Sequence, residues 1–348
     1  MKLDFDDILI VPAMTTEINS RSEVDVNCLH FGFNHLPIIA SPMDTVVDEN
    51  NIAEFERLNI SYCIPRGCPV KPTDDNIDIM AFKSYSLDEF INKFCGHGIN
   101  PEDLSKYILI DVANGHMDKL LEAVITFKRK FDSTYKLMVG NVANPQTFKL
   151  LSIAGADYIR IGIGNGNGCL TTQQTGIGYP MASLIIECSS IANEIELPKR
   201  AKIVADGGMK SYSDIIKALA LGADYVMIGS LLNKALDSSG PVTLFGIDID
   251  QHADYAKWLL DLGLPLRKKF RGMSTKDVQK KLKNNNLKTS EGVSRIYKID
   301  YTLESWTINF IDYLKSAMSY TDKKSLVTFI GNVDIIEISN SAFRRFNK

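Results

Sequence analysis

Residues 202–230, KIVADGGMKSYSDIIKALALGADYVMIGS, decide the fold class. The apolar run at 202–205 is followed by apolar residues at helical spacing over 213–221. Gly222 then marks the end of the helix, and a second apolar run occupies 224–228. A strand, a helix and a strand in this order predict two parallel strands joined by a crossover helix.

The same unit recurs along the chain, because short apolar runs alternate with helical patterns such as 145–154. Most of these runs are continuously apolar, as expected for parallel strands that are buried on both faces. The eight candidate strands are 37–41, 60–64, 77–82, 107–112, 136–139, 157–161, 202–205 and 224–228. Eight units within a chain of this length predict a closed (β/α)8 TIM barrel. A doubly wound open sheet is the alternative that the pattern leaves open.

The domain organisation predicted from the sequence is a single barrel domain over 1–348, because no Pro/Ser/Gly-rich linker divides the chain. Residues 271–300 form a loop region that we interpret as an active-site flap. Within it, the lysine-rich stretch 276–290 is either a mobile segment over the site or a solvated surface. Residues 301–348 are a C-terminal extension with an amphipathic helix at 303–317.

The composition excludes several classes of protein. The net charge is −3 and no basic stripe occurs, so we do not expect a nucleic-acid partner. No apolar stretch is long enough to span a membrane and no secretory signal precedes the first strand, so a cytoplasmic protein is expected. The six scattered cysteines form neither a disulfide framework nor a zinc pattern. Five of them are expected to be small buried hydrophobes.

The densest chemical signal is the glycine-rich loop GIGNGNGCLTT at 162–172. Such a loop after a strand lies on the catalytic face of a barrel, where its backbone can approach a ligand closely. Cys169 ends the loop, and Thr171 follows as a hydroxyl relay. A cysteine at this place is either a nucleophile or a buried loop thiol, and local sequence alone does not separate the two.

Two further glycine turns indicate a phosphate site. Asp206-Gly207-Gly208 ends the seventh strand, and Gly229-Ser230 ends the eighth. Phosphate sites in these barrels often follow strands seven and eight, although tight turns are the simpler explanation for each glycine alone. Asp206 can accept hydrogen bonds from ribose hydroxyls.

Polar residues after the fourth strand are further candidates. Asp111 and Asn114 can reach a cofactor or the edge of a base, although a helix N-cap explains them equally well. Glu291 offers a carboxylate beside Gly292, and a surface glutamate is the simpler interpretation of it in isolation.

These residues resemble the family of IMP dehydrogenase and GMP reductase. The loop ending at Cys169 is similar to the family's Gly-x-Gly-x-Gly-x-x-Cys-x-Thr, and 4–12 and 37–46 resemble its opening and its first-strand motif. The resemblance extends from Phe5 to about Thr328. Segments 83–89 and 175–180, together with the absence of an Arg-Tyr dipeptide, resemble the reductase branch.

The resemblance implies roles for individual residues. Cys169 would be the nucleophile, with Thr171 and Glu291 as the acid–base pair. The substrate-binding set would be Ser41, Met43, Asn167, Asp206, Gly207, Gly208, Gly229, Ser230, Gly272, Met273 and Ser274. The cofactor-binding set would be Lys83, Asp111, Asn114, Gly115 and Gly162. The carbonyls of Gly164, Gly166 and Cys169 would form a site for a monovalent cation, K⁺.

The function implied is NADPH-dependent reductive deamination of GMP to IMP through a covalent thioimidate on Cys169, by a homotetramer. IMP dehydrogenase, which forms XMP with NAD, is the alternative within the family. A barrel that binds purine nucleotides without turnover is the alternative from another class. Gln173 and Gln174 stand where the reductases have basic residues.

Overall fold

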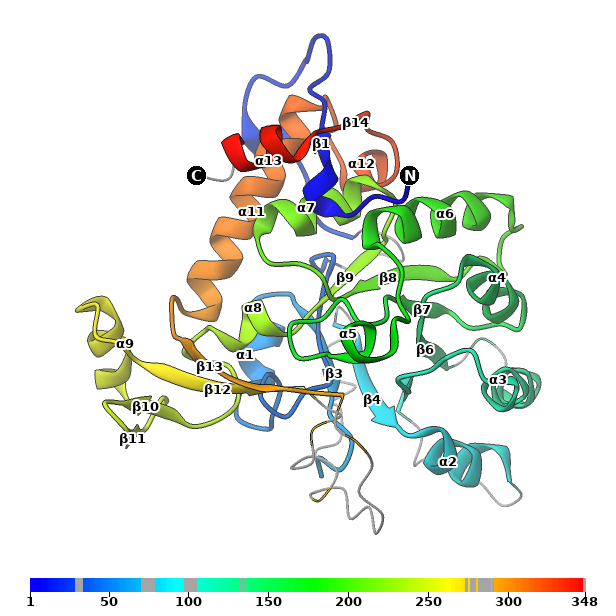
Figure 1. Ribbon diagram of the computed structural model, residues 1–348, viewed down its shortest axis with the longest axis horizontal. Helices are drawn as coiled ribbons and strands as arrows, with labels where there is room; N and C mark the ends of the chain where they lie inside the picture. The colour runs from blue at the N-terminus through cyan, green and yellow to red at the C-terminus, as the bar shows by residue number, and fades with distance from the viewer. Residues whose placement is uncertain are drawn as a thin grey trace.

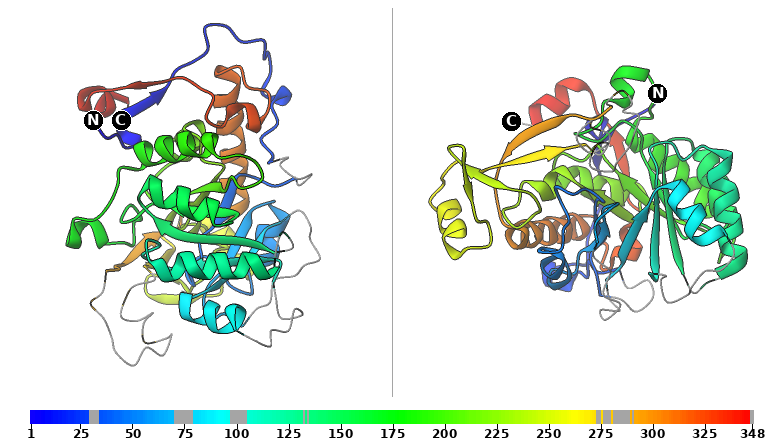
Figure 2. Two further views of the ribbon diagram at one scale, coloured as in Figure 1. Left: turned by 90° about the vertical axis from the view of Figure 1, so that its right-hand side faces the viewer. Right: turned by 90° about the horizontal axis from the view of Figure 1, so that it is seen from below.

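The computed structural model describes residues 1–28, 34–69, 79–96, 105–131, 133, 135–272, 275, 280, 289 and 291–346. Eight parallel strands close into a barrel (Figures 1 and 2), which confirms the predicted fold and excludes the open sheet. The strands are β2 (Ile38–Ala40), β3 (Ser61–Ile64), β4 (Ala81–Tyr85), β5 (Tyr107–Asp111), β6 (Lys136–Val142), β7 (Tyr158–Ile161), β8 (Lys202–Asp206) and β9 (Tyr225–Ile228). Closure comes from β9 against β2, where Ala40 pairs with Ile228.

All eight predicted strands are present, and the third differs most from its predicted range. The prediction placed it at 77–82, whereas β4 spans Ala81–Tyr85. The neighbouring strands set this boundary, since Ala81 pairs with Tyr62 of β3 and Tyr85 pairs with Ile110 of β5. The apolar character of the run could not reveal where those partners begin.

Helices cover the outside of the barrel, and local sequence sets their ends. The helix α4 (Pro145–Ile153) starts with proline after Asn144, whose side chain accepts a hydrogen bond from the Gln146 N–H. In α7 (Tyr212–Ala220), Ser211 and Asp214 form a reciprocal capping box. Among the described residues, the other helices are the 3-10 helices Phe5–Asp7 and Arg21–Glu23, α1 (Ile52–Arg57), α2 (Leu87–Phe90), the π-helix Ile91–Cys95, α3 (Asp118–Phe131), α5 (Thr171–Thr175), α6 (Met181–Glu194), α8 (Ser230–Asn233), α9 (Asp254–Asp261), α11 (Leu303–Tyr320), α12 (Leu326–Phe329) and α13 (Asn340–Phe346).

A small antiparallel sheet beside the barrel includes strands at the two ends of the predicted flap region. Its order is β11 (Ile247–Ile249), β10 (Val242–Leu244), β12 (Arg267–Arg271) and β13 (Ser294–Lys298). Arg271 pairs with Ser294, so residues 272 and 291–293 follow directly from the paired end. We call β12, β13 and these flanking residues the arm. The predicted flap region 271–300 therefore includes a strand, and most of 276–290 lies outside the described residues.

The N-terminal and C-terminal segments lie on the same side of the barrel (Figure 1). Strand β1 (Ile8–Ile10) pairs antiparallel with β14 (Ile335–Glu337) of the predicted C-terminal extension. The predicted helix at 303–317 is confirmed as α11, and its buried residues pack against the main core. Among the described residues, no helix is long and apolar enough to cross a membrane.

Candidate active site

The glycine-rich loop follows β7 at the carboxyl end of the barrel strands, as the sequence predicts. The Gly166 carbonyl accepts a hydrogen bond from the Cys169 N–H at 2.9 Å, which folds the loop back on itself. Gly164 has a φ of +82°, and a Cβ there would lie 1.7 Å from the Thr172 hydroxyl oxygen. This position therefore needs glycine for both conformation and space.

Three predicted catalytic side chains form one hydrogen-bonded chain. The Cys169 thiol donates to Thr171 Oγ1 at 3.1 Å, and the Thr171 hydroxyl donates to Glu291 Oε2 at 2.5 Å. All three groups are partly buried. Of the five cysteines predicted to be buried, Cys28, Cys63 and Cys188 are buried, whereas the prediction is wrong for Cys68 and Cys95, which are partly buried. Burial raises the pKa of the Cys28, Cys63 and Cys188 thiols, which disfavours their thiolates. The surface-glutamate interpretation of Glu291 is therefore wrong, because its carboxylate lies within the site.

Backbone hydrogen bonds join the Cys169 loop to the arm. The Leu170 N–H donates to the Glu291 carbonyl at 2.6 Å, and the Val293 N–H donates to the Gly168 carbonyl at 3.1 Å. The Gly272 N–H in turn donates to the Val293 carbonyl at 3.0 Å. A Cβ on Gly272 would lie 2.2 Å from the Gly168 carbonyl oxygen, so glycine permits this close approach. The arm thus sets the position of Glu291 relative to the thiol.

A buried lysine anchors the arm to the barrel. Lys268 on β12 is 1% exposed, and its ammonium group donates to the carbonyls of Ala235, Leu236 and Ser238 and to the Ser238 hydroxyl. Burial lowers the pKa of Lys268 to about 7, and Asp237 and Asp48 oppose that shift. Three residues further along β12, Arg271 forms a two-point ion pair with Asp44, which follows β2. Both contacts hold β12 against the loops at the barrel mouth.

The predicted phosphate residues also come together. Asn167 Nδ2 donates to Ser230 Oγ at 3.0 Å, which connects the Cys169 loop to the turn after β9. A Cβ on Gly207 would lie 2.9 Å from the Gly166 nitrogen, and one on Gly208 would lie 3.6 Å from Asn165 Cβ. On the other side, a Cβ on Gly229 would meet Met43 Sδ at 2.9 Å and Ser41 Oγ at 3.3 Å. Nine members of the predicted substrate set therefore lie around the barrel mouth. Met273 and Ser274 lie outside the described residues.

A row of polar side chains crosses the ends of four consecutive strands. Arg160 of β7 donates to Asp111 Oδ1 of β5 at 2.7 Å and to Asp206 Oδ2 of β8 at 2.8 Å. Asn141 of β6 donates to the same Asp206 oxygen at 2.7 Å. Burial alone lowers the pKa of Arg160, but the charges of the two carboxylates outweigh it and the net shift is upward. The guanidinium is therefore a permanent positive charge inside the barrel.

The predicted cofactor residues have mixed environments. Asp111 also forms an ion pair with Arg66 Nε at 3.2 Å. Lys83 donates to the Cys68 carbonyl at 2.6 Å, and burial lowers its pKa. Asn114 accepts a hydrogen bond from the His116 N–H and so caps a turn before α3. Gly115 and Gly162 pack too closely against Asn141 and Asp206, respectively, to accommodate a Cβ.

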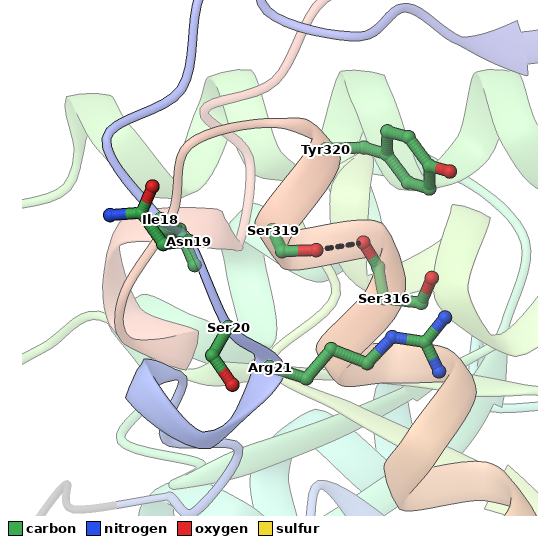
Figure 3. Close-up of a pocket in the computed structure, with 7 residues that line it drawn as sticks. All are labelled: Ile18, Asn19, Ser20, Arg21, Ser316, Ser319 and Tyr320. Atoms are coloured by element: carbon green, nitrogen blue, oxygen red, sulfur yellow. Dashed lines mark hydrogen bonds between the residues drawn. The ribbon is translucent and has the colours of Figure 1, made fainter.

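Two cavities in the structure lie away from these residues. One of about 190 Å³ lies between the N-terminal segment at 18–21 and Ser316, Ser319 and Tyr320 of α11 (Figure 3). The other, of about 510 Å³, lies between β1, α7 and α11. None of the predicted site residues lines either cavity. The active-site assignment therefore rests on the side-chain chemistry at the barrel mouth.

Arg160, Asn141 and Arg66 were not predicted from the sequence. A signal for Arg160 was present, because a charged residue interrupts the apolar run Tyr-Ile-Arg-Ile of β7. A charge buried in a parallel strand is expected to have a partner of opposite charge. Asn141 and Arg66 carry no comparable signal, since polar residues at strand ends are common.

Comparison with known proteins places the chain in a family. The model of the IMP dehydrogenase / GMP reductase domain matches residues 102–347. A GMP reductase from Phytophthora infestans is 30% identical over 297 residues, which cover 81% of this chain and 75% of that protein. Human GMP reductase 2 is 32% identical, covering 69% and 71% of the two chains, and a GMP reductase from Caenorhabditis elegans is 28% identical, covering 97% and 92%. The chain belongs to the IMP dehydrogenase / GMP reductase family.

Proposed function

We propose that the protein is a GMP reductase that converts GMP to IMP and ammonia at the expense of NADPH. The observation that carries the proposal is the chain of hydrogen bonds from Cys169 through Thr171 to Glu291. A thiol, a hydroxyl and a carboxylate in this order supply a nucleophile and a path for protons. The relatives described above are named GMP reductases, which favours this branch over IMP dehydrogenase.

The chemistry divides into two steps at C2 of the purine. The Cys169 thiol passes its proton through Thr171 to Glu291, and the resulting thiolate forms a C–S bond to C2. Glu291 then returns this proton through Thr171 to the exocyclic amino group, and the C–N bond breaks to release ammonia. A thioimidate then links the purine to Cys169. When bound, NADPH supplies the hydride that adds to C2. The C–S bond then breaks, and the electron pair returns to sulfur as thiolate. Two moderate barriers thus replace one difficult substitution.

The residues around the thiol fit a purine nucleotide. Asn167, Gly208, Gly229 and Ser230 supply amide and hydroxyl donors for the 5′-phosphate, and Asp206 supplies an acceptor for the ribose hydroxyls. Ser41, Met43, Gly207 and Gly272 complete the wall of this site.

The donor groups near Asp111 fit a dinucleotide. A carboxylate binds ribose hydroxyls, and the positive charge of Arg66 beside it suits phosphate. We assign Lys83, whose ammonium group donates to the Cys68 carbonyl, to the same site. We assign Asn114, Gly115 and Gly162 to the walls of the cofactor site. The carbonyl of Gly166 retains a second lone pair for K⁺ beside those of Gly164 and Cys169.

The test follows absorbance at the nicotinamide band with GMP plus NADPH, and separately with IMP plus NAD. GMP-dependent loss of NADPH supports the proposal, and IMP-dependent formation of NADH would establish the dehydrogenase instead. Binding of GMP without turnover in either direction would favour a nucleotide-binding barrel. The Cys169→Ala variant should bind GMP but lose turnover. Retained turnover in that variant would refute the covalent scheme. Repeating the assay with K⁺ replaced by a larger organic cation tests the cation site.

A further inference from the structure

Arg160 makes a connection that the proposed chemistry does not use. Its two terminal nitrogens bind different carboxylates, Asp111 and Asp206, on either side of the barrel mouth. The residue is 6% exposed, so these bonds are shielded from solvent. A Cβ on Gly140 would lie 2.6 Å from Arg160 Cβ, so glycine at that position lets β6 approach the arginine. Strands β6 and β7 are thus packed closely at the base of this side chain.

The two carboxylates are not left equally available to ligands. Both hydrogen bonds that described side chains donate to Asp206 end on Oδ2, so Oδ1 is the oxygen that can accept from a ribose hydroxyl. Asp111 has Arg160 on Oδ1 and Arg66 at 3.2 Å from Oδ2. The side chain of Arg66 is 24% exposed, whereas that of Arg160 is 7% exposed. Arg66 is therefore the partner that a ligand can displace from Asp111, and Arg160 is the fixed one.

We propose that Arg160 is a positioning residue that orients Asp206 toward the substrate ribose and Asp111 toward the cofactor, so that one guanidinium sets the affinity for both ligands. The inference rests on the proposed function, which places the two ligands at these carboxylates. The physical reason is the planar fork of arginine, which directs two donors along fixed and divergent lines. A lysine keeps the charge but has one nitrogen, so it cannot reproduce both directions.

The prediction separates Arg160 from its neighbour Asn141, which donates to Asp206 but not to Asp111 among the described contacts. Arg160→Met should raise KM for both GMP and NADPH by about 10- to 100-fold, the loss expected for an oriented charge-assisted hydrogen bond at each site. Asn141→Ala should raise KM for GMP and should change KM for NADPH less than Arg160→Met does, because its side chain donates to Asp206 and to the Gly162 carbonyl but not to Asp111. In Arg160→Lys, at least one of the two KM values should stay above that of the wild type.

Steady-state kinetics with each substrate varied, together with urea unfolding of each variant, tests the inference. A folded Arg160→Met with both KM values near those of the wild type, or with only one raised, would refute it. If Arg160→Met does not fold, Arg160→Lys decides. A raised KM for GMP, for NADPH or for both in this variant supports the proposal that one guanidinium positions both carboxylates, and wild-type values of both KM overturn it. Failure of the proposed function is distinguishable, because the wild-type protein itself would then show no GMP-dependent oxidation of NADPH.

Discussion

The contact between Gly272 and Gly168 offers a sharp test of how the arm controls the thiol. In a Gly272→Ala variant the new Cβ would lie 2.2 Å from the Gly168 carbonyl oxygen, whereas real Cβ contacts are essentially never below 3.0 Å. Both partners are backbone, so no flexible side chain can yield. The arm and the Cys169 loop must separate by about 1 Å, a displacement that can cost on the order of 100-fold in rate when it misplaces catalytic groups.

That separation acts directly on the reactive groups. The Gly168 carbonyl accepts the hydrogen bond from Val293, and Glu291 lies two residues before Val293 on the arm. A shift of about 1 Å lengthens the Thr171–Glu291 hydrogen bond well beyond its 2.5 Å. A 100-fold loss of kcat corresponds to about 2.7 kcal/mol in the activation free energy. We therefore expect Gly272→Ala to lose activity by about this factor while the barrel stays folded.

The assay is GMP-dependent oxidation of NADPH, with urea unfolding to confirm the fold. Gly96→Ala is the control for the glycine-to-alanine change itself, because its Cβ would have an ordinary contact of 3.6 Å with Asn92 O. The control should retain full activity. Wild-type kcat in Gly272→Ala would show that the close approach of arm and loop is not needed for turnover, and the geometric reasoning would be refuted.

Three other outcomes are expected. Thr171→Val should lower kcat about 10²- to 10⁴-fold with KM for GMP little changed, because it interrupts the proton path. Thr175→Val on the same helix is the control and should have a kcat near that of the wild type. Equal kcat values for the two variants would count against the proton path. Lys268→Met should lower the free energy of unfolding by about 3 kcal/mol in urea titrations, because it leaves buried carbonyls without a donor; an unchanged midpoint would contradict this. Burial lowers the pKa of His116 below 6.5, so the unfolded chain binds its proton first as the pH falls, and the free energy of unfolding should decrease below pH 6.5. The decrease should be smaller in His116→Gln, and identical pH profiles for the two proteins would exclude this origin.

Local patterns in the sequence predicted most of the fold and the reactive core of the site. Apolar runs, most of them continuous, marked all eight barrel strands, because strands covered on both faces need no alternation. Helix ends could also be recognised in the sequence, because Asn144 before α4 and Gly222 after α7 delimit these helices through contacts with residues close to them in the chain. Cys169 and Thr171 could be placed together because only Leu170 separates them.

The long-range parts of the site were decided by tertiary structure. Thr171 and Glu291 are 120 residues apart, and their contact depends on the antiparallel pairing of β12 with β13. The boundary of β4 depends on where β3 and β5 begin to pair with it.

The row joining Asp111 to Asp206 shows the same division. The sequence marked both carboxylates as candidates at strand ends, whereas Arg160 was not predicted, although it interrupts the apolar run of β7. Only closure of the barrel brings the guanidinium within 2.7 Å of one carboxylate and 2.8 Å of the other, across 49 and 46 residues of chain. Sequence by itself determined which residue types stand at the ends of the strands. Strand order and register decided which of them meet, because hydrogen bonds depend on distances in space that local patterns do not encode.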